Sequence, residues 1–331
     1  MKDGLITLGE ALIDFIPVDA ENKVYEKNFG GAPANVAVGA ALLGMKSAFI
    51  GKVGEDVLGV FLQQTLKDYG VDVSSLFLTK EHRTGLVFVT LDKLGERSFS
   101  FYIEESADLF LEESEIKEQL FKENKIFHFG TISLLKDPVQ SATKKAVLYA
   151  KENNMIVSFD PNIRLSLWKD EKLLKEIIFM MMKETDILKI SDEELLFLTG
   201  SNDINIIGKW MEQYSLSLVF LTKGEEGSTV FTKSGFAHVH ALKIKTVDTT
   251  GAGDAFVSGL LSCMNKRTGD ISSVTLDEAI DIAQFASISG GLAASQKGAI
   301  TALPTLEKVQ ETMREHGSSL GKDGYISNYD I

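Results

Sequence analysis

Short apolar segments alternate with longer amphipathic segments along most of the chain, and this alternation constrains the fold more than any other feature. The strand candidates are residues 5–8, 48–50, 126–129, 156–159, 187–190 and 218–221. Helical spacing begins after the first three of them, at Pro33, Val57 and Pro138. Strands that alternate with helices form a mostly parallel sheet with helices on both faces. The pattern therefore predicts a doubly wound α/β fold, in which ligands bind outside the carboxyl ends of the strands.

One region departs from the alternation, because two strand candidates follow each other without a helix. Residues 85–91 and 98–103 are joined by the short polar segment 92–96, a spacing typical of a β-hairpin. With further strand candidates at 12–17 and 23–29, this hairpin is expected to form a small separate sheet, a lid above the core. A hairpin added to the edge of the main sheet is the alternative.

These observations predict a single α/β domain over residues 1–316. Lid strands are inserted into it at about residues 12–29 and 85–103. The remaining tail, residues 317–331, is polar and contains Gly and Ser, so we expect no regular structure there.

The charge balance limits the classes of partner. The chain has 34 Lys and Arg residues against 47 Asp and Glu, a net charge of −13, which disfavours a nucleic-acid or anionic-membrane partner. The longest apolar block, residues 177–182, is far shorter than the roughly 20 residues of a membrane span. The first residues do not resemble a secretory signal, so a cytoplasmic location is expected.

Residues 248–254 read Asp-Thr-Thr-Gly-Ala-Gly-Asp and combine a glycine turn, a helix start and a carboxylate. The apolar spacing from Ala255 to Met264 predicts a buried helix directly after them. The free N–H groups and the positive dipole end of such a helix start suit a phosphate. Gly-x-Gly-Asp alone is also typical of a tight turn with a helix cap.

Asp254 suits one requirement of phosphoryl transfer to an alcohol, a group that takes the hydroxyl proton. A helix N-terminus keeps its carboxylate ionised, and placement against the hydroxyl matters more than an elevated pKa.

Two further segments place polar groups where ligands are expected. Residues 30–35 read Gly-Gly-Ala-Pro-Ala-Asn and open the first long helix; close packing explains the small residues but not the amide of Asn35. Residues 160–164 read Asp-Pro-Asn-Ile-Arg and follow a buried strand, so Arg164 emerges at the ligand edge of the sheet. Its planar guanidinium can bind sugar oxygens or phosphate, and a surface salt bridge is the alternative.

The heptapeptide at 248–254 and the order of these motifs along nearly the whole chain resemble the ribokinase-like carbohydrate kinases, the phosphofructokinase B family. The resemblance implies that Asp254 is the catalytic base and that Gly251, Ala252 and Gly253 form an anion hole. It implies sugar contacts from Asp14, Gly30, Gly31, Asn35, Tyr102, Arg164 and Asp254. It implies nucleotide contacts from Lys189, Ser191, Thr222, Lys223, Gly224, Gly227 and Gly253.

The resemblance also implies ions. Glu194 matches the last residue of the family's Asn-x-x-Glu motif, which orders Mg²⁺ through water, although Ser191 replaces the asparagine. The family's monovalent cation site, which suggests K⁺ activation, matches Asp248, Thr250, Ala293 and Gly298. One serine ligand of that site falls on Ala302 here.

The function that the resemblance implies is ATP-dependent phosphorylation of a sugar, with fructose giving fructose 6-phosphate as first choice. Residues 160–164 and the Gly-Glu-Arg turn at 95–97 resemble fructokinases, the bacterial ones most, more than ribokinases. Alternatives within the family are 2-keto-3-deoxygluconate and ribosides; an alternative of another class is a sugar- or nucleotide-binding regulator without turnover. Exposed lid edges favour a homodimer.

Overall fold

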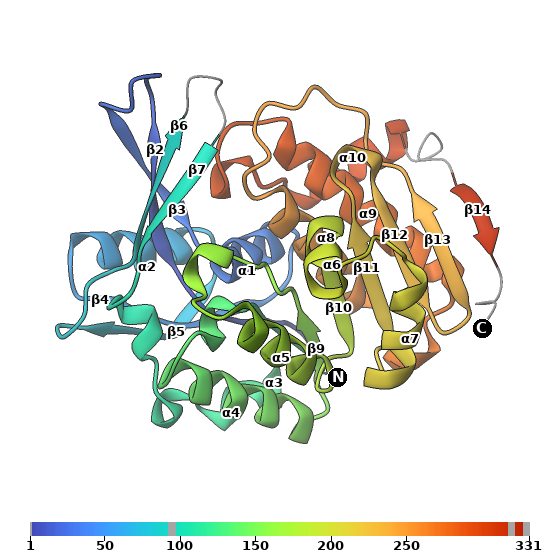
Figure 1. The fold of residues 1–331 in the computed structure, drawn as a ribbon, viewed down its shortest axis with the longest axis horizontal. Coiled ribbons are helices and arrows are strands. Elements are labelled where there is room, and N and C mark those ends of the chain that lie inside the picture. The colour runs from blue at the N-terminus through green and yellow to red at the C-terminus, as the bar shows by residue number, and fades with distance from the viewer. Residues whose placement is uncertain (1, 92–96, 317–321, 327–331) are drawn as a thin grey trace.

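The structure, a computed structural model, describes residues 2–91, 97–316 and 322–326. In this part of the chain the main sheet has ten strands in the order β14-β13-β12-β11-β10-β9-β8-β1-β4-β5 (Figure 1). They are β1 (Leu5–Leu8), β4 (Ser47–Gly54), β5 (Asp72–Thr79), β8 (Ile126–Phe129), β9 (Ile156–Phe159), β10 (Ile187–Ser191), β11 (Leu218–Thr222), β12 (Ser228–Thr232), β13 (Gly235–Val239) and β14 (Lys322–Ile326). Neighbours from β5 to β11 are parallel and those from β11 to β14 antiparallel, which confirms the predicted mostly parallel sheet.

Helices cover both faces of this sheet (Figure 1). They are α1 (Ala32–Leu42), α2 (Val57–Asp68), α3 (Glu118–Glu123), α4 (Val139–Glu152), α5 (Glu171–Met182), α6 (Asp192–Thr199), α7 (Asn205–Tyr214), α8 (Ala252–Lys266), α9 (Leu276–Ala294) and α10 (Leu306–His316). The helices expected at Pro33, Val57 and Pro138 are α1, α2 and α4, and each begins at or next to the predicted residue. Within the described residues, no helix is long and apolar enough to cross a membrane.

Strand β11 shows why the sequence needs helices on both sides. Val219 and Leu221 belong to the apolar core on one face, and Leu218 and Phe220 belong to the core formed with α8 and α9 on the other. All four side chains are fully buried. Because successive side chains of a strand point to opposite faces, a continuous apolar run must be covered twice.

The lid is a separate four-stranded sheet, hereafter the lid sheet, in the order β3-β2-β6-β7. Its strands are β2 (Leu12–Pro17), β3 (Tyr25–Gly30), β6 (Leu86–Leu91) and β7 (Arg97–Tyr102). It projects from the core at the upper left of Figure 1. This confirms the separate lid over the alternative of an edge hairpin; the predicted hairpin segment 92–96 lies outside the described residues.

The expectation of an unstructured tail is wrong for residues 322–326. They form β14, which pairs antiparallel with β13 (Figure 1, right edge). Strand β14 pairs with backbone groups that β13 would otherwise leave unpaired at the edge of the sheet. Because this pairing uses the backbone, it needs no apolar side-chain pattern that the sequence could reveal. The other tail residues lie outside the described part.

The sheet topology places one crevice for ligands. Strand β1 pairs with β4 on one side and with β8 on the other, so the chain builds the sheet outward in two directions from β1. Such a switch point opens a crevice at the carboxyl ends of the strands. Glu10 follows β1, Asp160 follows β9 and Lys189 lies near the end of β10, so all three face this crevice.

Candidate active site

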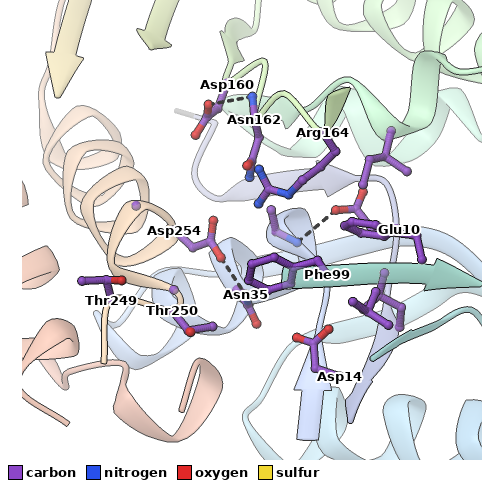
Figure 2. A pocket seen from close by; sticks show the side chains of 18 of the residues that line it. Glu10, Asp14, Asn35, Phe99, Asp160, Asn162, Arg164, Thr249, Thr250 and Asp254 are labelled. Atoms are coloured by element: carbon purple, nitrogen blue, oxygen red, sulfur yellow. Dashed lines mark hydrogen bonds between the residues drawn. The ribbon is translucent and has the colours of Figure 1, made fainter. Parts of the chain in front are cut away.

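A cavity of about 410 Å³ occupies the crevice, between the strand ends, the starts of α1 and α8, and the lid sheet (Figure 2). It brings together most of the residues predicted from the sequence for substrate and phosphate. Those that line it are Asp14, Gly31, Asn35, Arg164, Gly251, Gly253 and Asp254, joined by Lys189, predicted for the nucleotide, and Thr250, predicted for the monovalent cation.

Helix α8 begins as the motif predicts. Gly251 precedes it with φ 76°, a left-handed conformation that favours glycine, and Ala255 N–H donates the first intrahelical bond to the Gly251 carbonyl at 2.8 Å. The amides of Gly253 and Asp254 come before that bond. A Cβ on Gly253 would meet only Lys189 Nζ, at 3.8 Å, so this side of the helix start is open to a ligand.

The anion-hole prediction does not fit Ala252. Its amide donates to the Thr249 carbonyl at 3.1 Å, within the turn that leads into the helix. Ala252 also does not line the cavity. The turn uses this hydrogen bond, so the amides of Gly253 and Asp254, rather than that of Ala252, are the candidates for anion binding.

Asp254 is held by Asn35 across the cavity. Asn35 Nδ2 donates to Asp254 Oδ2 at 2.8 Å (Figure 2), joining the first turns of α1 and α8. Burial raises the pKa of Asp254 to about 6, against the hydrogen bond from Asn35. The sequence predicts that the helix start keeps this carboxylate ionised, whereas in the structure burial opposes its ionisation. With a pKa of about 6, the carboxylate is still mostly ionised at neutral pH. Asn35 Oδ1 is buried with no hydrogen-bond partner among the described residues, so it can accept from a ligand hydroxyl.

Asp14 reaches the cavity from β2 in the lid sheet. Burial raises its pKa to about 7, while Arg164 lowers it and Asp254 raises it further. Gly30, on the neighbouring strand β3, does not line the cavity; a Cβ there would collide with the Asp14 carboxylate. Gly30 thus leaves space for Asp14, rather than contacting a ligand as predicted.

Arg164 extends its guanidinium into the cavity above Asn35 (Figure 2). Its Nη1 donates to the Ile163 carbonyl at 3.2 Å, which orients the guanidinium. Arg164 thus lines the cavity, as predicted for an arginine after β9.

Tyr102 does not lie where the sequence predicts. It is 63% exposed and packs edge to face on Phe88, at 5.6 Å between ring centroids. Phe99 and Phe101 line the cavity instead. Successive residues of a strand face opposite ways, so the choice of a residue one position too far along β7 selects the wrong face of the lid sheet.

Sequence reasoning missed Glu10 and Asn162, both of which line the cavity. Glu10 Oε1 accepts from Ala32 N–H at 3.0 Å and so holds the start of α1; burial raises its pKa to about 8. Asn162 has φ 45° and lies three residues after the end of β9. Their position just after parallel strands was the signal that could have found them.

The predicted nucleotide residues lie beside the cavity, at the ends of β10 and β11. Ser191 caps α6, and its register partner on β11 is Thr222, whose Oγ1 donates to the Ile190 carbonyl at 3.3 Å. Lys223 N–H donates to the Gly227 carbonyl at 2.8 Å, closing the predicted turn. A Cβ on Gly224 would meet nothing within 4 Å, so this turn is open on one side. Of the predicted nucleotide set, Lys189 and Gly253 line the cavity.

Asp248 joins the segments predicted for a monovalent cation. Its Oδ1 accepts from Thr250 N–H at 2.9 Å and its Oδ2 from Gly298 N–H at 3.1 Å. Its own amide donates to the Ala294 carbonyl at 3.2 Å, next to Ala293 at the end of α9. The structure therefore brings the predicted cation residues to one place.

Glu194 lies buried at the start of α6, and burial raises its pKa. Its two oxygens accept from the amides of Ile163 and Ser191, each at 2.8 Å. Where the structure describes the chain, no group of three or more His, Cys, Asp or Glu side chains could hold a metal ion directly. Glu194 does not line the cavity, so its predicted water-mediated contact with Mg²⁺ stays a prediction.

The fold and the cavity define a small-molecule phosphotransferase: a helix start suited to phosphate, a buried carboxylate beside it and polar groups for an acceptor under a lid. Comparison with known proteins confirms this class, because the model of the pfkB family carbohydrate kinases matches residues 2–306. The chain belongs to this family.

Named relatives span almost the whole chain. It is 45% identical over 318 residues to "Probable fructokinase-6, chloroplastic" of Arabidopsis thaliana, covering 93% of this chain and 82% of that protein. A fructokinase from Xylella fastidiosa, solved with bound ATP, matches with a TM-score of 0.90 and 30% identity over 96% of this chain and 100% of that one. A fructokinase double mutant from Vibrio cholerae, solved with fructose, ADP and a potassium ion, matches with a TM-score of 0.84 and 38% identity. The match covers 94% of this chain and 99% of that one.

Proposed function

We propose that this protein is an ATP-dependent fructokinase that forms fructose 6-phosphate. The observation that carries the proposal is the placement of the buried Asp254 carboxylate beside the open amides at the start of α8, in the cavity that Asn35 and Arg164 also line. The fructokinases among the relatives and solved structures support fructose as the acceptor.

Asp254 is the general base in this proposal. ATP with Mg²⁺ supplies the phosphoryl group, and Asp254 accepts the proton of the sugar's primary hydroxyl as that oxygen bonds to phosphorus and ADP leaves. The amides of Gly253 and Asp254 and the ammonium of Lys189 stabilise the negative charge on the transferred group. The lid sheet excludes water from the cavity, which favours transfer over hydrolysis.

The sugar is held from three sides. Asn35 Oδ1, which lacks a partner among the described residues, accepts from a sugar hydroxyl. Asp14 approaches from the lid sheet, Arg164 from the loop after β9, and the Gly31 backbone from the start of α1. A ring with several hydroxyl groups matches these donors and acceptors.

The nucleotide is proposed to run from the start of α8 toward the ends of β10 and β11. Its contacts are Lys189, Ser191, Thr222, Lys223, Gly224, Gly227 and Gly253. The open side of Gly253 and the nearby Lys189 ammonium form a cradle of the right charge for phosphate. Glu194 orders Mg²⁺ through water.

A monovalent cation, K⁺ in the proposal, binds where Asp248 gathers Thr250 and the segment from Ala293 to Gly298. These residues fit such an ion because they offer oxygen ligands: the carboxylate of Asp248 and the backbone carbonyls of the neighbouring segments. The site lies directly before the turn that starts α8, so the ion would stabilise the anion-binding amides.

A comparison of acceptors tests the function. ATP consumption is measured with fructose, 2-keto-3-deoxygluconate, ribose and nucleosides, and we expect the highest kcat/KM for fructose. A higher kcat/KM for another acceptor would replace fructose with that substrate. Binding of sugar and ATP without turnover would instead indicate the non-catalytic regulator.

We further propose that residues 1–316 form one kinase domain, that the protein is cytoplasmic, and that it dimerises through the lid sheet.

The outer strands β3 and β7 each pair on one side only among the described residues, so their free edges can pair with a second copy. Light scattering after size exclusion measures the assembly, and cell fractionation measures the location. A monomer at micromolar concentration would contradict the dimer.

A further inference from the structure

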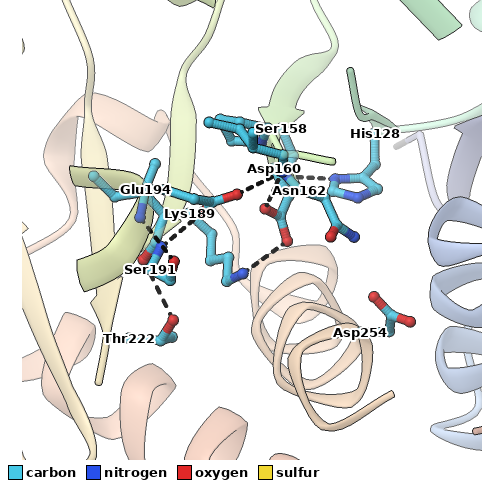
Figure 3. Close-up of polar contacts among 12 residues, drawn as sticks. His128, Ser158, Asp160, Asn162, Lys189, Ser191, Glu194, Thr222 and Asp254 are labelled. Carbon is cyan, nitrogen blue, oxygen red and sulfur yellow. Dashed lines mark hydrogen bonds and ion pairs between the residues drawn. The ribbon is translucent and has the colours of Figure 1, made fainter. Parts of the chain in front are cut away.

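The buried carboxylate of Asp160 links the sugar side of the cavity to the phosphate side (Figure 3). Asp160 is 4% exposed. Its Oδ1 accepts from Asn162 N–H at 3.1 Å, and its Oδ2 lies 3.0 Å from Lys189 Nζ. Asn162 and Lys189 both line the cavity, and Lys189 lies beside Gly253 at the start of α8. One carboxylate therefore orients a sugar-side loop and a phosphate-side cation together.

A second buried carboxylate joins the same two segments. Glu194 accepts from Ile163 N–H on the sugar-side loop and from Ser191 N–H at the end of β10, as described above. Ile163 lies between Asn162 and Arg164, so the loop of residues 160–164 is attached to the segment 189–194 at two points. The loop of residues 160–164 and Lys189 are therefore held in one arrangement by these contacts.

The Asp160–Lys189 ion pair has the carboxylates of Glu194 and Asp254 as charged neighbours, and His128 and Ser158 as a neutral pair nearby. His128 and Ser158 lie side by side on β8 and β9, with 3.0 Å between Nδ1 and Oγ (Figure 3). Burial lowers the pKa of His128 to about 3, so it carries no charge at neutral pH. His128 therefore does not compete with Lys189 as a cationic partner for Asp160.

We propose that Asp160 is a positioning residue that couples sugar binding to nucleotide binding. A sugar on Arg164 and Asn162 fixes the loop, the loop fixes the Asp160 carboxylate, and the carboxylate holds Lys189 where the phosphates bind. The coupling is reciprocal, because each ligand must change the affinity for the other by the same factor. The identity of the two ligands rests on the proposed function.

Isothermal titration calorimetry of the full-length protein measures this coupling. The Kd for fructose is determined with and without saturating ADP, and the ratio of the two values is the coupling factor. We expect a factor of about five or more, with the same factor for ADP with and without fructose.

The variant Asp160→Asn keeps an oxygen for Asn162 N–H but removes the charge that faces Lys189. We expect its Kd for fructose alone to stay within about threefold of the wild-type value, and its coupling factor to fall to about two or less. Glu193→Gln is the matched control, since it removes an exposed carboxylate from neighbouring α6, and it should keep the full factor. A merely structural role of Asp160 would weaken both Kd values alike and leave the factor unchanged.

A wild-type factor near one, or a full factor in Asp160→Asn, overturns the proposal. If Asp160→Asn does not fold by its melting curve, Lys189→Met tests the same link from the other side, and a retained factor there also overturns it. If fructose does not bind at all, the proposed substrate fails, and the coupling factor is measured with the acceptor that the activity comparison selects. The two failures are therefore distinguishable.

Discussion

Replacement of Asp254 by asparagine tests the central chemical step. Asparagine keeps the size of the side chain and an oxygen that can accept from Asn35 Nδ2, now at 2.8 Å from Asp254 Oδ2. It cannot take a proton. General-base catalysis contributes about 10²–10⁴-fold, so we expect kcat to fall by that factor, equivalent to about 3–5.5 kcal/mol of barrier.

The same substitution should stabilise the protein at neutral pH. Burial raises the pKa of Asp254 from 3.8 to about 6, so the folded protein holds the proton more tightly than the unfolded chain. The stability from this proton is fully present below the unfolded pKa and is lost as the pH rises through about 6. Two pKa units correspond to about 3 kcal/mol, the order of the penalty that Asp254→Asn removes above pH 6.

Three measurements on Asp254→Asn test the predicted loss of catalysis and gain of stability. They are kcat by a coupled assay, the fructose Kd by calorimetry, and the melting temperature as a function of pH. We expect a large loss of kcat, a nearly unchanged Kd, and a melting temperature above wild type at pH 7.5 but equal to it near pH 4. Asp281→Asn, which removes an exposed carboxylate from α9, is the control and should change none of the three. A kcat within tenfold of wild type would refute the role of Asp254 as base.

Three further predictions concern the same cavity. At a pH above about 7, where Asp14 is ionised, Asp14→Asn should raise KM for fructose about 10- to 100-fold, the value of a hydrogen bond to a charged group. The change in kcat should stay below about fivefold, and a kcat loss as large as that of Asp254→Asn would contradict a binding role. Turnover should be higher in K⁺ than in Na⁺ or a large inert cation, and Asp248→Asn should remove the difference; equal rates of the wild type in all three ions exclude activation. The kcat of the wild type should fall about tenfold per pH unit below about pH 6, as Asp254 becomes protonated, and a flat acid profile argues against this assignment.

The sequence predicts what is decided by local pattern. Apolar runs and helical spacing gave the parallel strands and the helices, and motifs at element ends gave Asn35, Arg164 and Asp254. Parallel strands bring their carboxyl ends to one edge of a sheet, so motifs far apart along the chain had to meet. The Asn35–Asp254 hydrogen bond joins residues 219 positions apart and confirms this reasoning.

The errors concern properties that depend on three-dimensional context. Tyr102 was placed on the wrong face of β7, because the side-chain direction in a strand changes with every residue and no local motif fixes it. Strand β14 was missed because its pairing uses the backbone, and Ala252 because the turn before α8 consumes its amide. The raised pKa of Asp254 arises from its burial in the folded protein, which no single segment encodes.

The buried carboxylates of the cavity and the buried ammonium of Lys189 affect each other's ionisation. Burial raises the pKa of Glu10, Asp14 and Asp254, so each carboxylate that remains ionised destabilises the folded protein at neutral pH. Lys189 is buried as well, yet Asp160 and Glu194 keep its pKa above the ordinary value, so its charge persists. A neutral lysine would remove the charge that phosphate needs, and an unpaired lysine would lose its proton to burial. In the proposed function, Asp160 and Glu194 therefore keep Lys189 charged for phosphate, and the Asp160–Lys189 ion pair lies between the two halves of the site.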